Sequence, residues 1–300
     1  MKQSLNPAPI ALFGFNRPVH ISKLLACLLS NPLASESDLF IFIDGARDST
    51  DSALVKEVRE ISARASGFKS VSIYQNETNR GLANSIIFGV NYVLSLHDRV
   101  IVLEDDLILS ASFLAFMNSA LDFYADNERV ISISGYTPRI ELDTPFYFMR
   151  GADCWGWATW RRGWEIFEPD GKVLLAAVKE KKIEHLLNLD GCFDFSGMLT
   201  SQINGVIDSW AIRWHVSAFI KDRLTLCPSK TLVLNNGLDG SGTHCAETKI
   251  FKDELYSGPI PNWDDCCEET ISAREQIKMF WRSKRRITRF VGSLMRKLCI

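Results

Sequence analysis

The sequence predicts an α/β protein in which a mostly parallel sheet is flanked by helices and followed by a less regular second half. Short apolar runs alternate with longer helical patterns through residue 135, which is typical of this class. The chain has 300 residues, 46% hydrophobic and 23% charged, so it can bury a sizeable core. Polar residues follow several apolar runs directly, as expected where ligands bind beyond the carboxyl ends of parallel strands.

Five short apolar runs, rich in β-branched and aromatic residues, predict the strands. They are Ile10–Phe15, Leu39–Ile43, Ser70–Tyr74, Val100–Leu103 and Val130–Ser134. Because helical patterns separate these runs, right-handed crossovers are expected to place the strands in one mostly parallel sheet.

Four helices are expected between these strands. The first begins at Pro18, the second is capped by Ser49 or Thr50, the third follows Gly81 and the fourth is capped by Ser110. Each helix carries apolar residues three and four positions apart, which predicts one buried face. The residues expected on these faces are Ile21, Leu24, Leu25, Leu28, Leu54, Val55, Val58, Ile61, Ile86, Ile87, Val90, Val93, Leu94, Phe113, Leu114, Met117 and Leu121.

The second half of the chain is less regular and richer in tryptophan and glycine. Residues 1–260 are predicted to form one domain with halves 1–135 and 136–260, since no repeat or low-complexity linker divides them. Within the second half, Lys172–Leu189 is expected to form one or two surface helices.

Residues 261–300 are predicted to form a basic amphipathic tail. From Gln276 to Ile300 the chain has eight basic residues and no acidic ones, so the rest carries a net charge of −10 within a total of −2. Apolar residues at helical spacing lie opposite the basic ones, which favours contact with an anionic membrane surface. The alternative is a helix that packs on the domain with Trp281 and Phe290 buried.

Composition excludes several classes of protein. The near-neutral charge excludes a generally basic nucleic-acid binder. The eight cysteines form no CxxC pair, which favours reduced thiols in a cytosol. The apolar run Ala8–Phe15 is too short for a secretory signal or a membrane span, so a cytoplasmic protein is expected. GxSxG, HExxH, Walker and GxGxxG motifs are absent, which argues against hydrolases, zinc proteases, kinases and dehydrogenases.

The sharpest feature is an acidic triplet, Glu104, Asp105 and Asp106, that follows the apolar run Val100–Leu103. Three carboxylates at the end of a buried strand repel one another unless a cation binds them. Because side chains alternate along a strand, Glu104 and Asp106 are expected to point one way and Asp105 the other. A hard metal ion on one side and a ribose or base on the other suit this arrangement. The alternative is a solvated turn.

These residues resemble a known family. The segment Leu103–Leu107 (LEDDL) resembles the metal-binding acidic motif of nucleotide-sugar-dependent glycosyltransferases with the GT-A fold, and is especially similar to that of the eukaryotic N-acetylglucosaminyltransferase I family. Asn16–Pro18 and Gly81–Ala83 resemble segments of bacterial family 2 glycosyltransferases. The segments occur in order over about residues 8–250. The resemblance implies a Rossmann-like GT-A fold whose first half binds a nucleotide and whose second half binds an acceptor.

The resemblance also implies roles for the donor side. Asp106 would coordinate Mn²⁺ or Mg²⁺ bridging the diphosphate of the donor, with Asp105 and Glu104 near its ribose and sugar. Asp44 would accept a hydrogen bond from the nucleotide base, and Arg17 would line the same pocket. The bare sequence places Asp44 and Arg17 at carboxyl ends of strands, where ligands bind. Their alternatives are a turn aspartate and a solvated arginine.

A second candidate site is the segment Ile207–Trp214. Inverting glycosyl transfer needs a carboxylate that deprotonates the acceptor hydroxyl. In the resembling family this base is an Asp just before a Trp, and Asp208 matches it, although Ser209 stands where the family has a second Asp. The alternative is that Asp208 caps a helix over Ser209–Ile220.

Two further segments carry candidate ligand contacts. Asp153 and Trp155 align with the acceptor-side loop of the family and are the predicted acceptor contacts, whereas nearby Trp157, Trp160 and Trp164 have helical spacing and are expected to pack a core.

The Gly-rich loop Gly237–His244 can offer backbone N–H groups and His244 to phosphates, or form a flexible surface loop. The other four histidines show no ligand spacing and are interpreted as structural or surface residues.

Together these features predict a metal-dependent, inverting glycosyltransferase. It would move a sugar from a nucleoside diphosphate, UDP for preference, to a saccharide or lipid-linked acceptor at the cytoplasmic membrane face, as in surface polysaccharide synthesis. One alternative is a sugar-nucleotide nucleotidyltransferase, which normally carries a basic Gly-rich loop after the first strand; Gly14–Pro18 matches that poorly. The other is a non-catalytic carbohydrate-binding protein, which would not explain three carboxylates on a buried strand.

Overall fold

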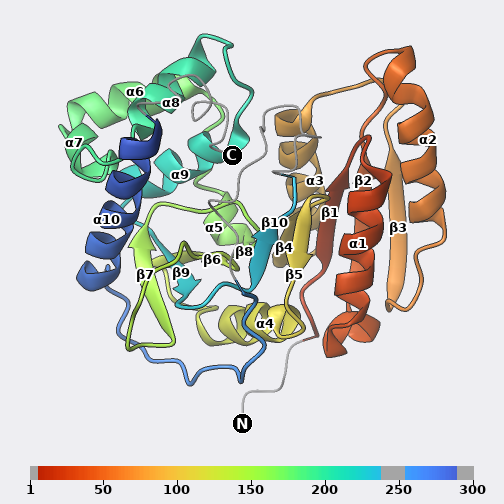
Figure 1. Ribbon diagram of the computed structural model, residues 1–300, viewed down its shortest axis with the longest axis horizontal. Helices are drawn as coiled ribbons and strands as arrows, with labels where there is room; N and C mark the ends of the chain where they lie inside the picture. Colours follow the sequence, from red (N-terminus) through yellow and green to blue (C-terminus); the bar gives the residue numbers. More distant parts are fainter. Residues whose placement is uncertain (1–5, 238–253, 289–300) are drawn as a thin grey trace.

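The computed structural model describes residues 6–237 and 254–288. Its centre is a sheet with the strand order β3-β2-β1-β4-β8-β6-β9-β7 (Figure 1). The strands of this sheet are β1 (Ile10–Gly14), β2 (Asp38–Ile43), β3 (Ser70–Gln75), β4 (Arg99–Glu104), β6 (Val130–Ser134), β7 (Phe146–Arg150), β8 (Trp157–Trp160) and β9 (Leu224–Pro228). Strands β8 and β7 run opposite to the other six. The predicted mostly parallel α/β sheet is confirmed, and the arrangement is consistent with a Rossmann-like GT-A fold.

All five strands expected from the sequence are present, with ends that agree within one residue. Strand β8 comes from the second half of the chain and separates β4 from β6. It pairs antiparallel with both, so that Ala158 lies between Ile101 and Ile133. The two halves of the sequence therefore share one continuous sheet.

Helices cover both faces of the sheet. The helices are α1 (Pro18–Leu29), the 3₁₀ helix η1 (Pro32–Glu36), α2 (Ser49–Ala63), α3 (Leu82–Leu96), α4 (Phe113–Phe123), α5 (Arg161–Trp164), α6 (Gly171–Glu180), α7 (Glu184–Leu187), α8 (Phe195–Ile203), α9 (Trp210–Ile220) and α10 (Ile271–Thr288). One apolar cluster joins α1, α2 and α4 to one face of the sheet, and a second joins α3, α5 and α9 to the other. Helices α6 and α7 fill the segment predicted as one or two surface helices.

Two of the expected helix caps are wrong. The cap of α2 is Asp48, not Ser49 or Thr50, and its carboxylate accepts hydrogen bonds from backbone N–H groups in the first turn. An ionised carboxylate also interacts more favourably with the helix dipole than a hydroxyl does. Ser110 does not cap α4, because the N-cap position of this helix is Ser112. The Ser110 hydroxyl instead accepts a hydrogen bond from the Ser112 backbone N–H.

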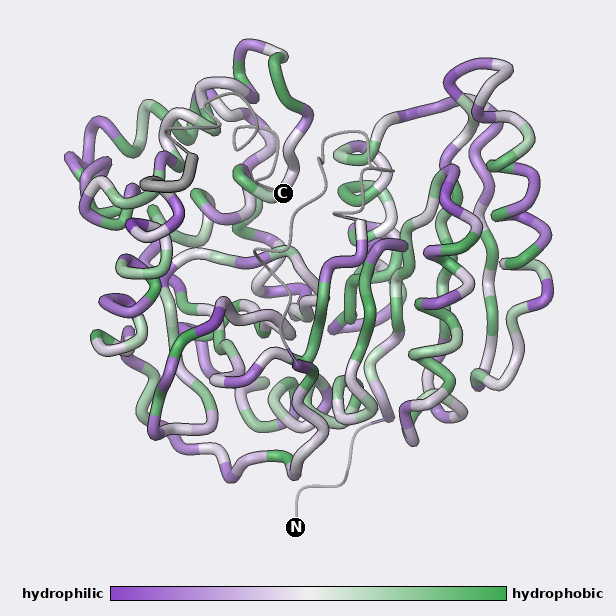
Figure 2. Tube along the Cα trace, viewed as in Figure 1, coloured by the Kyte–Doolittle hydropathy of each residue, from purple (hydrophilic) through white to green (hydrophobic). Residues whose placement is uncertain are grey.

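Strand β1 illustrates why the sheet is buried on both sides. Ile10 and Leu12 belong to the cluster under α1, α2 and α4, whereas Ala11 and Phe13 belong to the cluster under α3, α5 and α9, as expected for alternating side chains. Figure 2 shows apolar residues concentrated along the central strands and hydrophilic ones on outer turns of helices. Leu54, predicted to face inward, is an exception and is 41% exposed.

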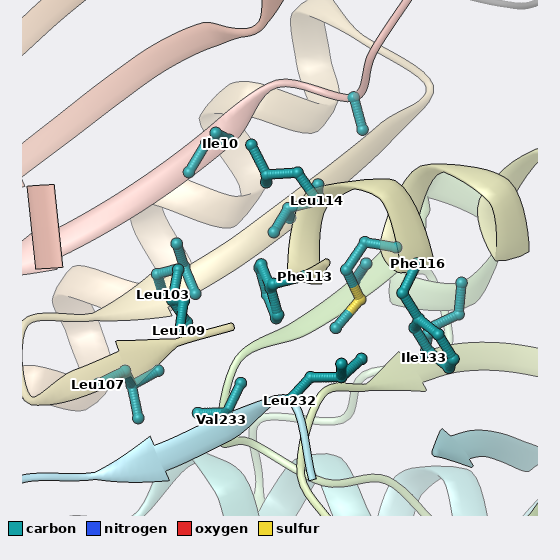
Figure 3. Close-up of a cluster of buried hydrophobic side chains, with 14 of the residues drawn as sticks. Ile10, Leu103, Leu107, Leu109, Phe113, Leu114, Phe116, Ile133, Leu232 and Val233 are labelled. Carbon is teal, nitrogen blue, oxygen red and sulfur yellow. The ribbon is translucent and has the colours of Figure 1, made fainter. Parts of the chain in front are cut away.

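A two-stranded antiparallel sheet extends the fold beyond β4. It consists of β5 (Leu107–Leu109) and β10 (Val233–Asn235), and the register pairs Leu107 with Asn235. Figure 3 shows Leu107, Leu109 and Val233 packed with Leu103 and Phe113. This pairing brings the residues after β10 to the acidic triplet.

Four tryptophans form a buried cluster on the α9 side of the sheet. The ring centroid of Trp157 lies 5.6 Å from that of Trp164, 5.4 Å from Trp210 and 5.7 Å from Trp214. The expected core packing of Trp157, Trp160 and Trp164 is confirmed, since all three are buried. Their helical spacing is misleading, because Trp157 and Trp160 lie on strand β8.

The described part of the tail packs on the domain. Helix α10 buries Ala273 and Ile277 against Tyr147 and neighbouring residues, with Trp281 packed at the edge of the same cluster. Lys278 is only 7% exposed and lies 2.7 Å from an Asp190 carboxylate oxygen, so it does not belong to a free cationic face. Phe290 and the rest of 289–300 lie outside the described residues. No helix in the described ranges is long and apolar enough to cross a membrane.

Candidate active site

The acidic triplet forms a turn at the carboxyl end of β4. Glu104 is the last residue of the strand, and Asp105 and Asp106 form the turn before β5. Arg17, at the N-cap position of α1, contacts both aspartates: its Nη1 is 3.1 Å from Asp106 Oδ2 and 4.0 Å from Asp105 Oδ1. Asp105 Oδ2 also accepts a hydrogen bond from Phe15 N at 3.2 Å. The strict alternation expected of the three carboxylates is wrong, because the turn brings both aspartates to one guanidinium.

Burial raises the pKa of all three carboxyl groups, and repulsion from neighbouring aspartates adds to the rise for Glu104 and Asp105. Burial is the largest cause, and the neighbouring aspartates add to it, so that the pKa of Glu104 rises to about 8 and that of Asp105 to about 7. Burial also raises the pKa of Asp106, although Arg17 opposes the rise. One guanidinium does not compensate three carboxylates, so the turn attracts further positive charge.

The segment after β10 packs on this turn. The Asn236 N–H donates to the Asp106 carbonyl at 2.6 Å, and the Asn236 carbonyl lies 3.3 Å from His20 Nε2. A Cβ at Gly237 would collide with the side chains of Asp106 and Arg17. The first residue of the predicted Gly-rich loop therefore lies on the acidic turn. His244 lies outside the described residues, and its phosphate contact stays a prediction.

Asp44 binds the loop that leads into α3. Its carboxylate accepts hydrogen bonds from the backbone N–H groups of Gly45, Arg80 and Gly81 at 2.9–3.1 Å and from Asn76 Nδ2 at 3.2 Å. The side chain is buried. Its role as a base contact stays a prediction, and such a contact would be made in addition to these hydrogen bonds.

Asp208 lies just before α9 and is exposed. The cap of α9 is the neighbouring Ser209, whose hydroxyl accepts a hydrogen bond from Ile212 N at 3.2 Å, so the alternative that Asp208 is the cap is wrong. Within the described residues the Asp208 carboxylate has no hydrogen-bond or ion-pair partner. Its Oδ2 lies against Gly81 at the start of α3, 3.2 Å from where a Cβ on that residue would be.

The N-terminus of α9 joins Asp208 to the acidic turn. Trp210 is the first residue of the helix and is fully buried, and its indole opposes the rise in the pKa of Glu104. The Trp210 N–H nevertheless lacks a well-aligned hydrogen bond to any described acceptor. Asp208, Gly81 and Glu104 therefore surround one edge of the sheet, where strands β2 and β4 end.

Asp153 and Trp155 lie on the other side of α9. Asp153 Oδ1 accepts hydrogen bonds from Cys154 N at 2.6 Å and Trp155 N at 3.4 Å, and burial raises its pKa. The Trp155 ring packs against Tyr136 with centroids 4.5 Å apart. Both predicted acceptor residues line a cavity of about 180 Å³ that Ala211 of α9 also lines.

The acidic turn fits a hard divalent cation that binds together with a phosphate ligand. In the described ranges, no three His, Cys, Asp or Glu side chains are grouped as a metal site, so these residues alone do not form a metal cage. Mg²⁺ is commonly held by one or two carboxylates plus substrate phosphates, and carboxylate oxygens also suit Mn²⁺. Asp106, with its raised pKa and partly exposed side chain, is the residue that would hold such an ion.

Sequence reasoning missed His20, Trp210 and Asn236 as neighbours of the acidic turn. The segments that form β5 and β10 are short apolar runs, and neither was recognised as a strand. Their pairing is what brings Asn236 to the turn. Trp210 was visible two residues after Asp208, but its burial beside Glu104 depends on how α9 packs against the sheet.

No protein-family model matches the chain, and no curated protein matches it. Among solved structures, it is similar to a cytidylyltransferase from Leptospira borgpetersenii serovar Hardjo-bovis, strain JB197, with 12% identity and a TM-score of 0.31 over 43% of this chain and 53% of that one. It is also similar to S. aureus TarS, with 18% identity and a TM-score of 0.28 over 42% of this chain and 21% of that one.

A structure of S. aureus TarS residues 1–349 matches with 15% identity and a TM-score of 0.32, over 58% of this chain and 49% of that one. The chain thus spans between about a fifth and about half of the length of these structures. Similarity at this level does not indicate function, so the proposal below rests on the site itself.

We expect the metal-free protein to lose stability as pH rises. A carboxyl group whose pKa is raised by folding stabilises the fold fully below its unfolded pKa, near 4, and this contribution is lost as pH rises through the folded values of about 7 and 8. The Glu104→Gln variant lacks one such group. The slope of its unfolding free energy against pH should therefore be shallower than that of the wild type, by up to about 1.4 kcal/mol per pH unit.

Urea unfolding in EDTA from pH 5 to pH 9 measures this difference. Glu57→Gln, at an exposed position of α2, is the matched control and should follow the wild type. Equal slopes for the wild type and Glu104→Gln would contradict the raised pKa of Glu104.

Proposed function

We propose that the chain is a metal-dependent, inverting glycosyltransferase. It transfers a sugar from a nucleoside diphosphate sugar to a saccharide or lipid-linked acceptor. UDP is the proposed nucleotide of the donor. The observation that carries the proposal is the pairing of two unlike acidic sites at one edge of the sheet. One is the buried turn Glu104–Asp106, which attracts positive charge. The other is Asp208, an exposed carboxylate that has no hydrogen-bond or ion-pair partner among the described residues and interacts electrostatically with Arg213.

These two sites match the two requirements of inverting transfer. The acceptor oxygen forms a bond to the anomeric carbon while the bond from that carbon to the diphosphate oxygen breaks. Asp208 accepts the proton of the acceptor hydroxyl in this step. Asp106 would hold a divalent ion, which would supply positive charge to neutralise the departing diphosphate. Because Ser209 caps α9, Asp208 is not engaged in holding the helix and is available as a base.

The remaining predicted residues form the donor and acceptor sides. Arg17 holds Asp105 and Asp106 in place beside the diphosphate, and Glu104 faces the sugar. Asp44 fixes the loop before α3 and in this proposal also contacts the base. His244 is proposed to contact the phosphates. Asp153 and Trp155 are proposed to contact the acceptor.

The alternatives differ in their products. A nucleotidyltransferase would need basic residues free to bind a triphosphate after β1, whereas Arg17 is engaged with two aspartates. Incubation with UDP-sugars and Mn²⁺ should release UDP, whereas sugar-nucleotide synthesis from UTP and a sugar phosphate would favour the nucleotidyltransferase. Sugar binding that is indifferent to metal and nucleotide, with neither reaction, would favour a carbohydrate-binding protein.

Asp106→Ala should abolish turnover and the Mn²⁺-dependent thermal shift by nucleotide, while the fold is retained because removing one carboxylate relieves repulsion. For the wild type, nucleotide at 100 times its Kd should add about 2.7 kcal/mol of stability. Asp98→Ala, on the exposed surface, is the control and should behave as the wild type. Full wild-type activity in excess EDTA would contradict the metal assignment.

Asp208→Asn should leave stability and donor affinity unchanged and lower kcat by roughly 10²–10⁴-fold, the usual contribution of a positioned base. The structure provides a matched control in Ser209→Ala, which removes the cap and should lower the unfolding free energy by about 1 kcal/mol without a comparable loss of kcat. Steady-state kinetics and thermal unfolding measure both variants. If Asp208→Asn kept its kcat, the base would have to be a different residue.

We also propose that the tail contacts anionic lipid at the cytoplasmic membrane face. Lys278 is engaged with Asp190, so the contact would come from the basic residues beyond it, each worth about 1 kcal/mol near a charged surface. Removal of residues 289–300 takes away three of these seven basic residues, Arg289, Arg296 and Lys297, so it should weaken binding to anionic vesicles at low salt and leave turnover of a soluble acceptor unchanged. Vesicle flotation at low and high salt measures this. If the full-length protein does not bind anionic vesicles at low salt, the proposed lipid contact is wrong.

A further inference from the structure

The cavity beside α9 has a wall that belongs to the C-terminal helix. It lies among β7, β9, α9 and α10, which are neighbours in Figure 1. Most of its lining is apolar or aromatic, with Trp155 and Phe219 from the domain and Ile277 and Trp281 from α10. Pockets of this kind bind the apolar part of a ligand and orient it with a few polar groups.

Two polar side chains of the lining have buried atoms without a partner. Arg274 of α10 is 5% exposed; its Nη2 lies 2.9 Å from Asp190 Oδ1, but its Nη1 has no described hydrogen-bond partner. His215 Nδ1 lies 2.9 Å from the Ala152 carbonyl, while its Nε2 is buried without a described partner. Unsatisfied buried polar atoms are costly, and a ligand in the cavity would satisfy them.

The state of each group defines what it would bind. Arg274 Nη1 is a donor and needs an acceptor oxygen. Burial lowers the pKa of His215 to about 4, so the ring is neutral. Its Nδ1 lies 2.9 Å from the Ala152 carbonyl and 3.3 Å from the Ala152 nitrogen. With the proton on Nδ1 for the shorter contact, Nε2 accepts a hydrogen bond from a donor such as a hydroxyl. Asp153 also accepts hydrogen bonds from donors. The ligand is therefore a hydroxylated ring with an apolar face and one acceptor oxygen.

The charge around Arg274 favours a neutral acceptor oxygen. Asp190 lies beside both Arg274 and Lys278, and Glu275 lies 2.6 Å from Lys278, so two carboxylates already balance the two cations. A carboxylate of the ligand would add a charge to an apolar wall, which is costly without a second cation. An amide carbonyl makes the same hydrogen bond without this cost, and its methyl group suits a wall that contains Ile277 and Trp281.

The cavity is next to the proposed base. Ala211, which lines it, is three residues after Asp208 in the sequence, and Asp153 and Trp155 line the same cavity. One helical turn is about 5.4 Å. The cavity and Asp208 therefore both lie at the N-terminal end of α9.

We propose that this cavity binds an N-acylated amino sugar of the acceptor, with Arg274 hydrogen-bonded to the acyl carbonyl. This inference deepens the proposed function and rests on it, because the bound sugar is an acceptor only if the protein is a glycosyltransferase. It also assigns the C-terminal helix to acceptor selection: α10 supplies Arg274, Ile277 and Trp281 to the site.

The test measures binding of methyl glycosides to the full-length protein by ligand-observed NMR, without nucleotide. The probes are N-acetylglucosamine, N-acetylgalactosamine, glucosamine, glucose and glucuronic acid glycosides. We expect at least one N-acetylated probe to bind about tenfold more tightly than the sugars without the acyl group, the effect of one hydrogen bond to a charged donor. Arg274→Met should remove this preference, and Lys278 keeps Asp190 paired in that variant.

A second pair of variants tests whether a loss of binding is caused by misfolding. Ile277→Trp fills the cavity and should abolish binding of all probes, whereas Met279→Trp places the same ring on the outer side of α10, where Met279 is 57% exposed, and should bind as the wild type. All variants should keep the thermal shift by nucleotide and Mn²⁺, which shows that the fold and the donor site are intact.

The outcomes separate this inference from the proposed function. Equal binding of all probes, tighter binding of the glucuronide, or an acyl preference that survives Arg274→Met would overturn the acceptor assignment while the nucleotide shift persists. The expected probe pattern in a protein that shows no nucleotide shift would support the cavity as an amino-sugar site and reject the transferase.

Discussion

The site depends on the contact of Arg17 with two carboxylates at the end of a buried strand. Strands β1 and β4 are neighbours, with Phe13 opposite Glu104, so the residues that follow both strands meet at the same edge. Arg17 therefore lies beside Asp105 and Asp106, and the β5–β10 pair encloses them. The single guanidinium leaves the group short of positive charge, which is the physical reason to expect a cationic ligand there.

The first half of the fold could be predicted from the sequence because its signals are local. The apolar run at Ile10–Phe15 and the helical spacing after Pro18 each depend on neighbouring residues, and both predict the observed elements. Strand β8 was not, because tryptophans at Trp157 and Trp160 are compatible with either helix or strand. Its position between β4 and β6 is a long-range property that no local pattern contains.

The candidate site divides in the same way. The acidic turn was visible as a strand that ends in three carboxylates, but the contact between Asn236 and Asp106 required the pairing of segments more than a hundred residues apart. The sequence does not decide whether Asp208 or Ser209 caps α9, because Asp and Ser are both common N-cap residues. The structure gives that role to Ser209, so the adjacent Asp208 carboxylate does not cap the helix.

Helix α10 shows how one segment can look like a membrane tail and still belong to the core. Its basic and apolar residues alternate at helical spacing, which is the pattern of an interfacial helix. In the fold, however, the apolar side covers Tyr147 and Cys227, and Arg274 and Lys278 are buried beside Asp190. A buried arginine with an unsatisfied donor is not needed for packing, since an apolar residue would fill the same space. Its Nη1, which has no described hydrogen-bond partner, is the atom that the proposed ligand would satisfy.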